Sequence, residues 1–157
     1  MNIGVERGDI VTSAADTLIV NLFEGVTTPG GATGAADKAL NGAITDLISG
    51  GDFKGKAGEI AVVYPRGAIA ARRVLIVGLG KADTFNLESV RRAAATGIKR
   101  ARDLNAQHVA SIVHGAGIGG LDIAAATQAT VEGSLLATYR FDAQKKKEPA
   151  NELASLT

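Results

Sequence analysis

Apolar residues gather into short runs along the chain, and these runs predict buried strands. Residues 2–6 (NIGVE) and 17–23 (TLIVNLF) are two of them, and the second is continuous, as expected for a strand buried on both faces. Residues 59–65 and 72–80 are separated by a short link that suits a hairpin-like, antiparallel connection better than a helical crossover. Residues 107–115 predict a further strand.

Between these runs the apolar residues recur at the spacing of a helix. Residues 36–48 have one apolar face, which ends at the SGGD that follows. Residues 86–104 predict a longer helix with Asn86 as its N-cap, and residues 121–141 predict another with Asp122 near its start. The predicted order is therefore β, β, α, β, β, α, β, α.

Strands that alternate with helices indicate the α/β class, arranged as a three-layer α/β/α sandwich. We expect a mixed sheet, because two of the links are too short for crossovers between parallel strands. The length of 157 residues suits one domain with a real core.

The end of the chain differs from the rest in composition. Residues 143–157 (AQKKKEPANELASLT) combine a lysine run with a proline and have no long periodic segment. We therefore expect one domain over residues 1–142 and a linker over 143–157, in which LASLT is a candidate start of a strand.

Composition narrows the chemistry that is available. The chain is 46% hydrophobic and 4% aromatic, so its core is built mainly from Ala, Val, Leu and Ile. The absence of cysteine excludes disulfides, thiolate metal sites and a cysteine nucleophile. No signal-peptide pattern is present and no apolar run approaches the roughly 20 residues that cross a bilayer, which predicts a cytoplasmic protein without a membrane partner.

The charge pattern argues against a nucleic-acid partner. Seventeen Lys and Arg face sixteen Asp and Glu, so the formal net charge is only +1. The basic residues of the helix over 91–102 are interleaved with alanine, and aromatic platforms for stacking bases are missing from it. A solvated helix face explains these residues better than a nucleic-acid site.

Two glycine-rich turns are candidate nucleotide loops. Gly78 and Gly80 begin G-x-G, but Asp83 stands where the third glycine of that fingerprint belongs, and its carboxylate would repel a pyrophosphate. We interpret this turn as a tight link from strand to helix. Residues 113–120 (VHGAGIGG) are a better anion cradle, although ordinary strand-to-helix geometry explains them as well.

Candidates for hydrolytic chemistry are scarce. The sequence holds no D-x-D, H-E-x-x-H or G-x-S-x-G pattern. His108 and His114 share a strand face but lie about 20 Å apart at the rise of a strand, so they cannot bind one metal together. His114, at the strand end, is a candidate site residue.

Several stretches together resemble the N-terminal domain of leucyl aminopeptidases, the M17 cytosol aminopeptidase family. The most specific are residues 51–59 (GDFKGKAGE), 74–81 (VLIVGLGK) and 139–149 (YRFDAQKKKEP). The resemblance implies a larger polypeptide in which a later catalytic domain binds two divalent metals, zinc or manganese, and a hexamer of such subunits. The family's metal ligands surround an N-T-D-A-E-G-R motif in that later domain, so no catalytic or metal residue, and no cofactor, is assigned to this chain.

The first half also resembles macrodomains, which bind ADP-ribose. Residues 8–10, 16–21, 30–40 and 115–120 stand where that family has an adenine-contacting aspartate, a ribose-contacting asparagine and two phosphate loops. The resemblance implies a ligand set of Asp9, Asn21, Gly30, Gly31, Gly115 and Gly117. This chain departs from the family pattern at Glu24, whose carboxylate we expect beside the distal ribose and phosphates.

These observations lead to two hypotheses from different classes. The first is a noncatalytic, macrodomain-like N-terminal domain of an aminopeptidase, whose partners are the catalytic domain of the same polypeptide and further copies of it. It would serve assembly or substrate access. The alternative is a binding module for ADP-ribose or a related nucleotide.

Overall fold

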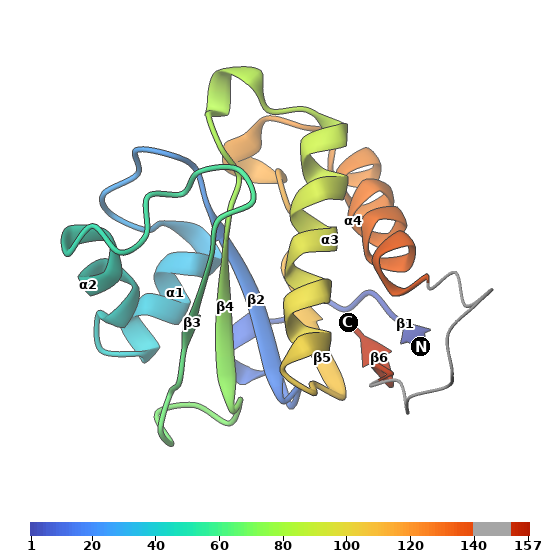
Figure 1. Ribbon diagram of the computed structural model, residues 1–157, viewed down its shortest axis with the longest axis horizontal. Coiled ribbons are helices and arrows are strands. Elements are labelled where there is room, and N and C mark those ends of the chain that lie inside the picture. Colours follow the sequence, from blue (N-terminus) through green and yellow to red (C-terminus); the bar gives the residue numbers. More distant parts are fainter. Residues whose placement is uncertain (140–151) are drawn as a thin grey trace.

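The computed structural model of the protein describes residues 1–139 and 152–157 (Figure 1). Its strands are β1 (Asn2–Ile3), β2 (Thr17–Leu22), β3 (Ile60–Val63), β4 (Arg73–Gly78), β5 (His108–Ser111) and β6 (Ser155–Leu156). Its helices are α1 (Gly31–Ala39), α2 (Ala43–Ser49), α3 (Leu87–Asp103) and α4 (Ile123–Thr138), with short 3-10 helices η1 (Ile10–Thr12), η2 (Ala82–Thr84) and η3 (Gly117–Gly119).

The strands form a 6-stranded mixed sheet in the order β1-β6-β5-β2-β4-β3. The pairs along it are parallel except for β3 and β4, which run antiparallel with Ile60 opposite Val77 and Val63 opposite Val74. The predicted antiparallel pair and the mixed sheet are thus confirmed. The short link between these two strands leaves no room for a crossover helix.

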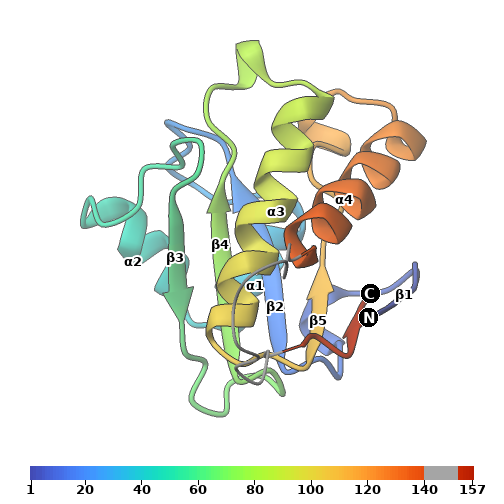
Figure 2. The same cartoon turned by 45° about the vertical axis from the view of Figure 1, so that its right-hand side comes forward.

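Helices cover both faces of the sheet, as Figures 1 and 2 show. Alternate residues of the central strands point to opposite faces. Ile19, Leu75 and Val77 pack with residues of α3, whereas Leu18 and Ile76 pack with residues of α1 and α2. The three-layer α/β/α sandwich is therefore confirmed, and its two cores explain why β2 and β4 are apolar without interruption.

The single helix expected over residues 36–48 is wrong, because the structure has two helices there and the first already begins at Gly31. Asn41 and Gly42 adopt positive φ angles of 55° and 84°, and such left-handed residues end α1. The Asp37 carboxylate then accepts hydrogen bonds from the backbone N–H groups of Ile44 (2.8 Å) and Thr45 (3.0 Å), at the start of α2. Apolar spacing alone does not reveal this break.

The two longer helices follow the sequence closely. Asn86 caps α3 by accepting a hydrogen bond from the N–H of Ser89 (3.0 Å), and Asp122 caps α4 through the N–H of Ala125 (2.9 Å). The last residues of the helix predicted over 121–141 lie outside the described residues. Within the described part of the chain no helix is long and apolar enough to span a membrane.

The C-terminal residues return to the sheet. β6 lies between β1 and β5 and runs parallel to both, and Leu153 and Leu156 are buried in the core beneath α3. The start of a strand predicted within LASLT corresponds to β6 at Ser155–Leu156. The boundary expected after residue 142 lies outside the described residues.

Candidate functional site

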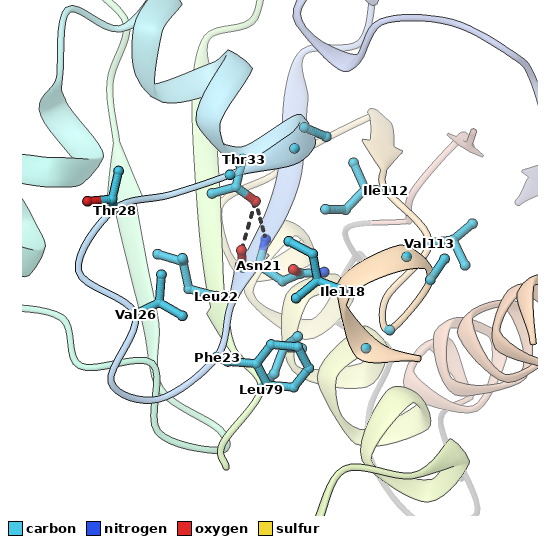
Figure 3. Close-up of a pocket in the computed structure, with 17 residues that line it drawn as sticks. Asn21, Leu22, Phe23, Val26, Thr28, Thr33, Leu79, Ile112, Val113 and Ile118 are labelled. Atoms are coloured by element: carbon cyan, nitrogen blue, oxygen red, sulfur yellow. Dashed lines mark hydrogen bonds between the residues drawn. The ribbon is translucent and has the colours of Figure 1, made fainter. Parts of the chain in front are cut away.

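The neighbouring strands β2 and β5 stop pairing before β2 ends. β5 pairs with β2 only from Thr17 to Ile19. Beyond that point the Thr33 hydroxyl accepts a hydrogen bond from the N–H of Asn21 (3.4 Å) and donates one to its C=O (2.7 Å), as Figure 3 shows. β2 leads to α1 on one face and β5 to α4 on the other (Figure 1). A crevice at such a switch point is the usual ligand site of α/β sheets.

A cavity of about 450 Å³ occupies this place (Figure 3). It brings together five residues of the predicted ligand set: Asn21, Gly30, Gly31, Gly115 and Gly117. The other residues that line it are Leu22, Phe23, Val26, Thr28, Ala32, Thr33, Leu79, Ile112, Val113, Ala116, Ile118 and Gly119. All of these side chains are uncharged, so an anion in the cavity would depend on backbone N–H groups.

The start of α1 supplies such groups. Gly30 is the N-cap residue and has no side chain that could cap the helix, and the helical hydrogen bonds begin where the N–H of Gly34 donates to the C=O of Gly30 (2.9 Å). Gly31, Ala32 and Thr33, which follow the cap, all line the cavity. The amides at the start of a helix favour anions through their free N–H groups and the helix dipole.

The loop over residues 115–119 forms the opposite wall. A Cβ atom on Gly115, whose φ is +81°, would lie 2.5 Å from Cε1 of Phe85. Phe85 in turn packs edge-on against Phe23, with ring centroids 4.9 Å apart. The side chain of Ile118 is 79% exposed and reaches to 3.8 Å from the Cβ position of Gly30, so it spans the two glycine loops at the cavity mouth.

His114 contacts Asn21 but is not among the residues that line the cavity. Its side chain is fully buried, and its Nδ1 is 2.8 Å from Nδ2 of Asn21. Burial lowers the pKa of His114 to about 4, so the imidazole is neutral near pH 7. Its Nε2 is buried without a hydrogen-bond partner among the described residues. Sequence reasoning named His114 but missed this contact, since no local pattern links residues 93 apart.

Asp9 and Glu24 lie outside this cavity. Asp9 lines an adjoining hollow that shares Ala32, Ile112 and Val113 with the cavity, so the two spaces are neighbours. The Asp9 carboxylate caps η1 by accepting a hydrogen bond from the N–H of Val11 (2.9 Å). Glu24 is not a lining residue, so the repulsive carboxylate expected beside the phosphates does not face the cavity.

The turn at Gly78 and Gly80 also lies apart from the cavity, although Leu79 between them lines it. Gly80 has a φ of +77°, and its N–H donates to the C=O of Gly55 (2.9 Å). The loop over 54–58 is itself closed by Glu59, whose carboxylate accepts hydrogen bonds from the N–H groups of Lys54 and Lys56. The first glycine turn thus serves packing against this loop.

The described residues do not form a cluster of metal ligands. Over residues 1–139 and 152–157, no group of three or more His, Cys, Asp or Glu side chains could hold a metal ion together. His108, the other histidine, instead has its Nδ1 2.9 Å from Oγ of Ser155 in the neighbouring strand.

This chain is similar to known aminopeptidases in sequence and in fold. A probable cytosol aminopeptidase of Roseiflexus castenholzii is 36% identical over 160 residues, which cover 100% of this chain and 30% of the relative. The chain thus spans less than a third of that relative's length. Tomato leucine aminopeptidase, solved as a K354E mutant, superposes with a TM-score of 0.78 at 20% identity, covering 99% of this chain and 32% of that protein.

The fold is also that of macrodomains. A Trypanosoma brucei macrodomain solved in complex with ADP-ribose matches 87% of this chain and 57% of its own, with a TM-score of 0.71 at 18% identity. Residues 19–148 match the family model described as the cytosol aminopeptidase family, N-terminal domain. The chain belongs to the cytosol aminopeptidase family, M17, and corresponds to its macrodomain-like N-terminal domain.

Proposed function

We propose that this chain is the noncatalytic N-terminal domain of a leucyl aminopeptidase and serves assembly or substrate access. The observation that carries the proposal is the match of residues 19–148 to the N-terminal domain of the family, together with a span of 30% of the Roseiflexus relative. Peptide hydrolysis then belongs to the remaining part of a longer polypeptide.

In that polypeptide the later domain binds two divalent metals, zinc or manganese, and uses them to activate a water against the N-terminal peptide bond. The subunits assemble as a hexamer in the cytoplasm. This domain acts through its contacts with protein neighbours.

Exposed apolar side chains near the end of α4 support a role in contacts. Leu135 and Leu136 lie in the last turn of α4 and Tyr139 is its C-cap residue, and their side chains are 48%, 70% and 75% exposed. Clusters of this kind are typical of surfaces that meet other protein.

A fusion with the Roseiflexus relative tests the role. The relative would be prepared intact, without its N-terminal third, and with that third replaced by this chain. Assembly is measured by light scattering, and access by hydrolysis of leucine amide against longer peptides. We expect the deletion to change oligomer size or peptide-length preference and the fusion to restore it. A truncated relative with unchanged size and preference would refute the proposal.

A second candidate function is the binding of ADP-ribose or a related nucleotide. It is favoured by the convergence of Asn21 with both glycine loops on one cavity, beside the hollow that holds Asp9. An amide there can recognise a ribose hydroxyl, the start of α1 can hold a phosphate, and the Asp9 hollow can take an adenine.

Calorimetry with ADP-ribose tests this candidate. A micromolar Kd, about −8 kcal/mol, is the supporting result, and no heat at millimolar ligand removes the candidate. Ala32→Glu places a carboxylate at the start of α1, where it suits the helix dipole but repels a phosphate, so it should abolish binding without unfolding the protein. Ala35→Glu, on an exposed position of α1 outside the cavity lining, is the matched control.

A further inference from the structure

Among the described residues that line the cavity, Asn21 has the one polar side chain that is neither exposed nor hydrogen-bonded to the backbone. Thr28 is exposed at the mouth, and the hydroxyl of Thr33 is occupied by both backbone groups of Asn21. The direction in which the side-chain amide of Asn21 points its oxygen therefore decides whether the cavity offers a hydrogen-bond acceptor or a donor.

His114 fixes that direction. A neutral imidazole has one N–H donor and one bare, accepting nitrogen. In the structure Nδ2 of Asn21 faces Nδ1 of His114 at 2.8 Å, so Nδ1 is the acceptor and the proton resides on Nε2. Because the imidazole ring is fully buried, no water competes with Asn21 for Nδ1. The opposite orientation of the amide, with Oδ1 toward His114, would require the proton on Nδ1.

The contact with Asn21 leaves the other nitrogen of the imidazole ring in an unfavourable state. Nε2 is buried without a partner among the described residues, so its N–H is left unpaired. Buried polar groups without partners are uncommon and are found where the surrounding structure requires them. The contact with Asn21 is the single hydrogen bond of the His114 side chain within the described part of the chain.

We propose that His114 is a positioning residue: by accepting from Nδ2 it holds Oδ1 of Asn21 as the side-chain acceptor of the cavity and selects ligands that present a hydroxyl donor there. With the uncapped start of α1 on the same cavity, the preferred ligand class is a phosphorylated sugar whose hydroxyl reaches Asn21 while a phosphate meets the amides of 31–33. The ligand class rests on the second proposed function, whereas the orientation of the amide does not.

Nitrogen NMR of the unliganded protein tests the orientation directly. With ¹⁵N-labelled histidine at pH 7, the expected result is a proton on Nε2 of His114 and a bare Nδ1 with the shift of a hydrogen-bond acceptor. A proton on Nδ1 would mean that Asn21 presents its oxygen to His114 instead, and would overturn the proposal. This measurement decides the matter even if ADP-ribose fails to bind.

A pair of variants tests the consequence for binding, with ADP-ribose as the probe. His114→Leu removes the acceptor, while His114→Asn keeps an oxygen near the position of Nδ1. We expect His114→Leu to weaken binding about tenfold, as for one lost hydrogen bond, and His114→Asn to stay within about threefold of the parent.

A double-mutant cycle separates positioning from a general loss of structure. In an Asn21→Ala background the two His114 variants should bind ADP-ribose equally, because there is no amide left to orient. An undiminished difference between them in that background, or equal binding by both in the presence of Asn21, would overturn the proposal. Thermal unfolding of each variant confirms that the compared proteins are folded.

Discussion

The carbonyl oxygen of Lys56 occupies the place that a Cβ atom of Gly78 would take. A Cβ built on Gly78 lies 2.0 Å from that oxygen, well inside any permitted contact. The close approach lets the loop over 54–58 lie across the end of β4, where the N–H of Gly78 donates to the C=O of Glu59 (2.8 Å). The glycine at the end of this strand is therefore required by packing.

Gly78→Ala should destabilise the protein by about 3 kcal/mol, because backbone on both sides must shift to admit the methyl group. Urea unfolding measures the change. Gly8→Ala is the control, since nothing lies within 4 Å of a Cβ at Gly8, and it should change stability by less than about 0.5 kcal/mol. Equal stability of the two variants would contradict this interpretation.

Asp16 joins the start of β2 to β5. Its carboxylate accepts hydrogen bonds from the Thr17 hydroxyl (2.6 Å) and from the backbone N–H groups of Gln107 and His108 (2.8 Å each). Asp16→Ala should cost about 3 kcal/mol in unfolding free energy, since the three donors lose their acceptor. Asp16→Asn keeps one oxygen and should cost less; a larger loss for asparagine than for alanine would be evidence against this role.

The carboxylate of Asp16 should also make the free energy of unfolding fall at acid pH. Burial alone would raise the pKa of Asp16, but the hydrogen bonds from Thr17, His108 and Gln107, with the charge of Arg73, outweigh it and the pKa lies below 3.8. The folded pKa is depressed, so this contribution is present above pH 3.8 and is lost as the pH falls through the folded value. Acid unfolding of Asp16→Asn should lack that component.

Thr33 holds the strand end that carries Asn21. Thr33→Val keeps the shape of the side chain but removes the hydroxyl that bonds both backbone groups of Asn21, and it should destabilise the protein by about 2 kcal/mol. Thr33→Ser retains the hydroxyl and should be the more stable of the two in thermal or urea unfolding. A valine variant at least as stable as the serine variant would show that these hydrogen bonds contribute nothing.

The buried imidazole of His114 should make stability depend on pH in a second, higher range. Its pKa is lowered from 6.5 to about 4 by burial, so the unfolded chain takes up a proton before the folded protein does. Stability should be fully present above pH 6.5 and decline as the pH falls toward 4, by up to roughly 3 kcal/mol. Unfolding free energies of the parent and His114→Leu, measured across this range, should differ by that slope. Parallel curves would mean that the imidazole is not buried as described.

Sequence patterns predicted the sheet and the longer helices because their signals are local. The continuous apolar run at 17–23 and the capped, periodic segment from Asn86 correspond directly to β2 and α3. The break at Asn41 and Gly42 escaped detection, because it depends on two positive φ angles and on an Asp37 carboxylate that caps the next helix. Helical spacing continues across it undisturbed.

The site was predictable in part. Asn21 and the two glycine loops were named from a resemblance, and the division of the sheet between β2 and β5 brings them to one cavity. The contact between His114 and Asn21 was not predictable, since it joins residues 93 apart in sequence that meet beyond the paired part of β2 and β5. The position of Glu24 outside the cavity likewise depends on the path of the chain after β2 rather than on its composition.

The central claim is that this chain is a noncatalytic domain of an aminopeptidase, and hydrolysis of leucine amide by the purified chain tests it most directly. The chain would be assayed at micromolar concentration with added manganese or zinc, beside the metal alone. We expect release of leucine at the rate of the metal control. Turnover that rises in proportion to this chain and remains with it through a further purification step would contradict the account.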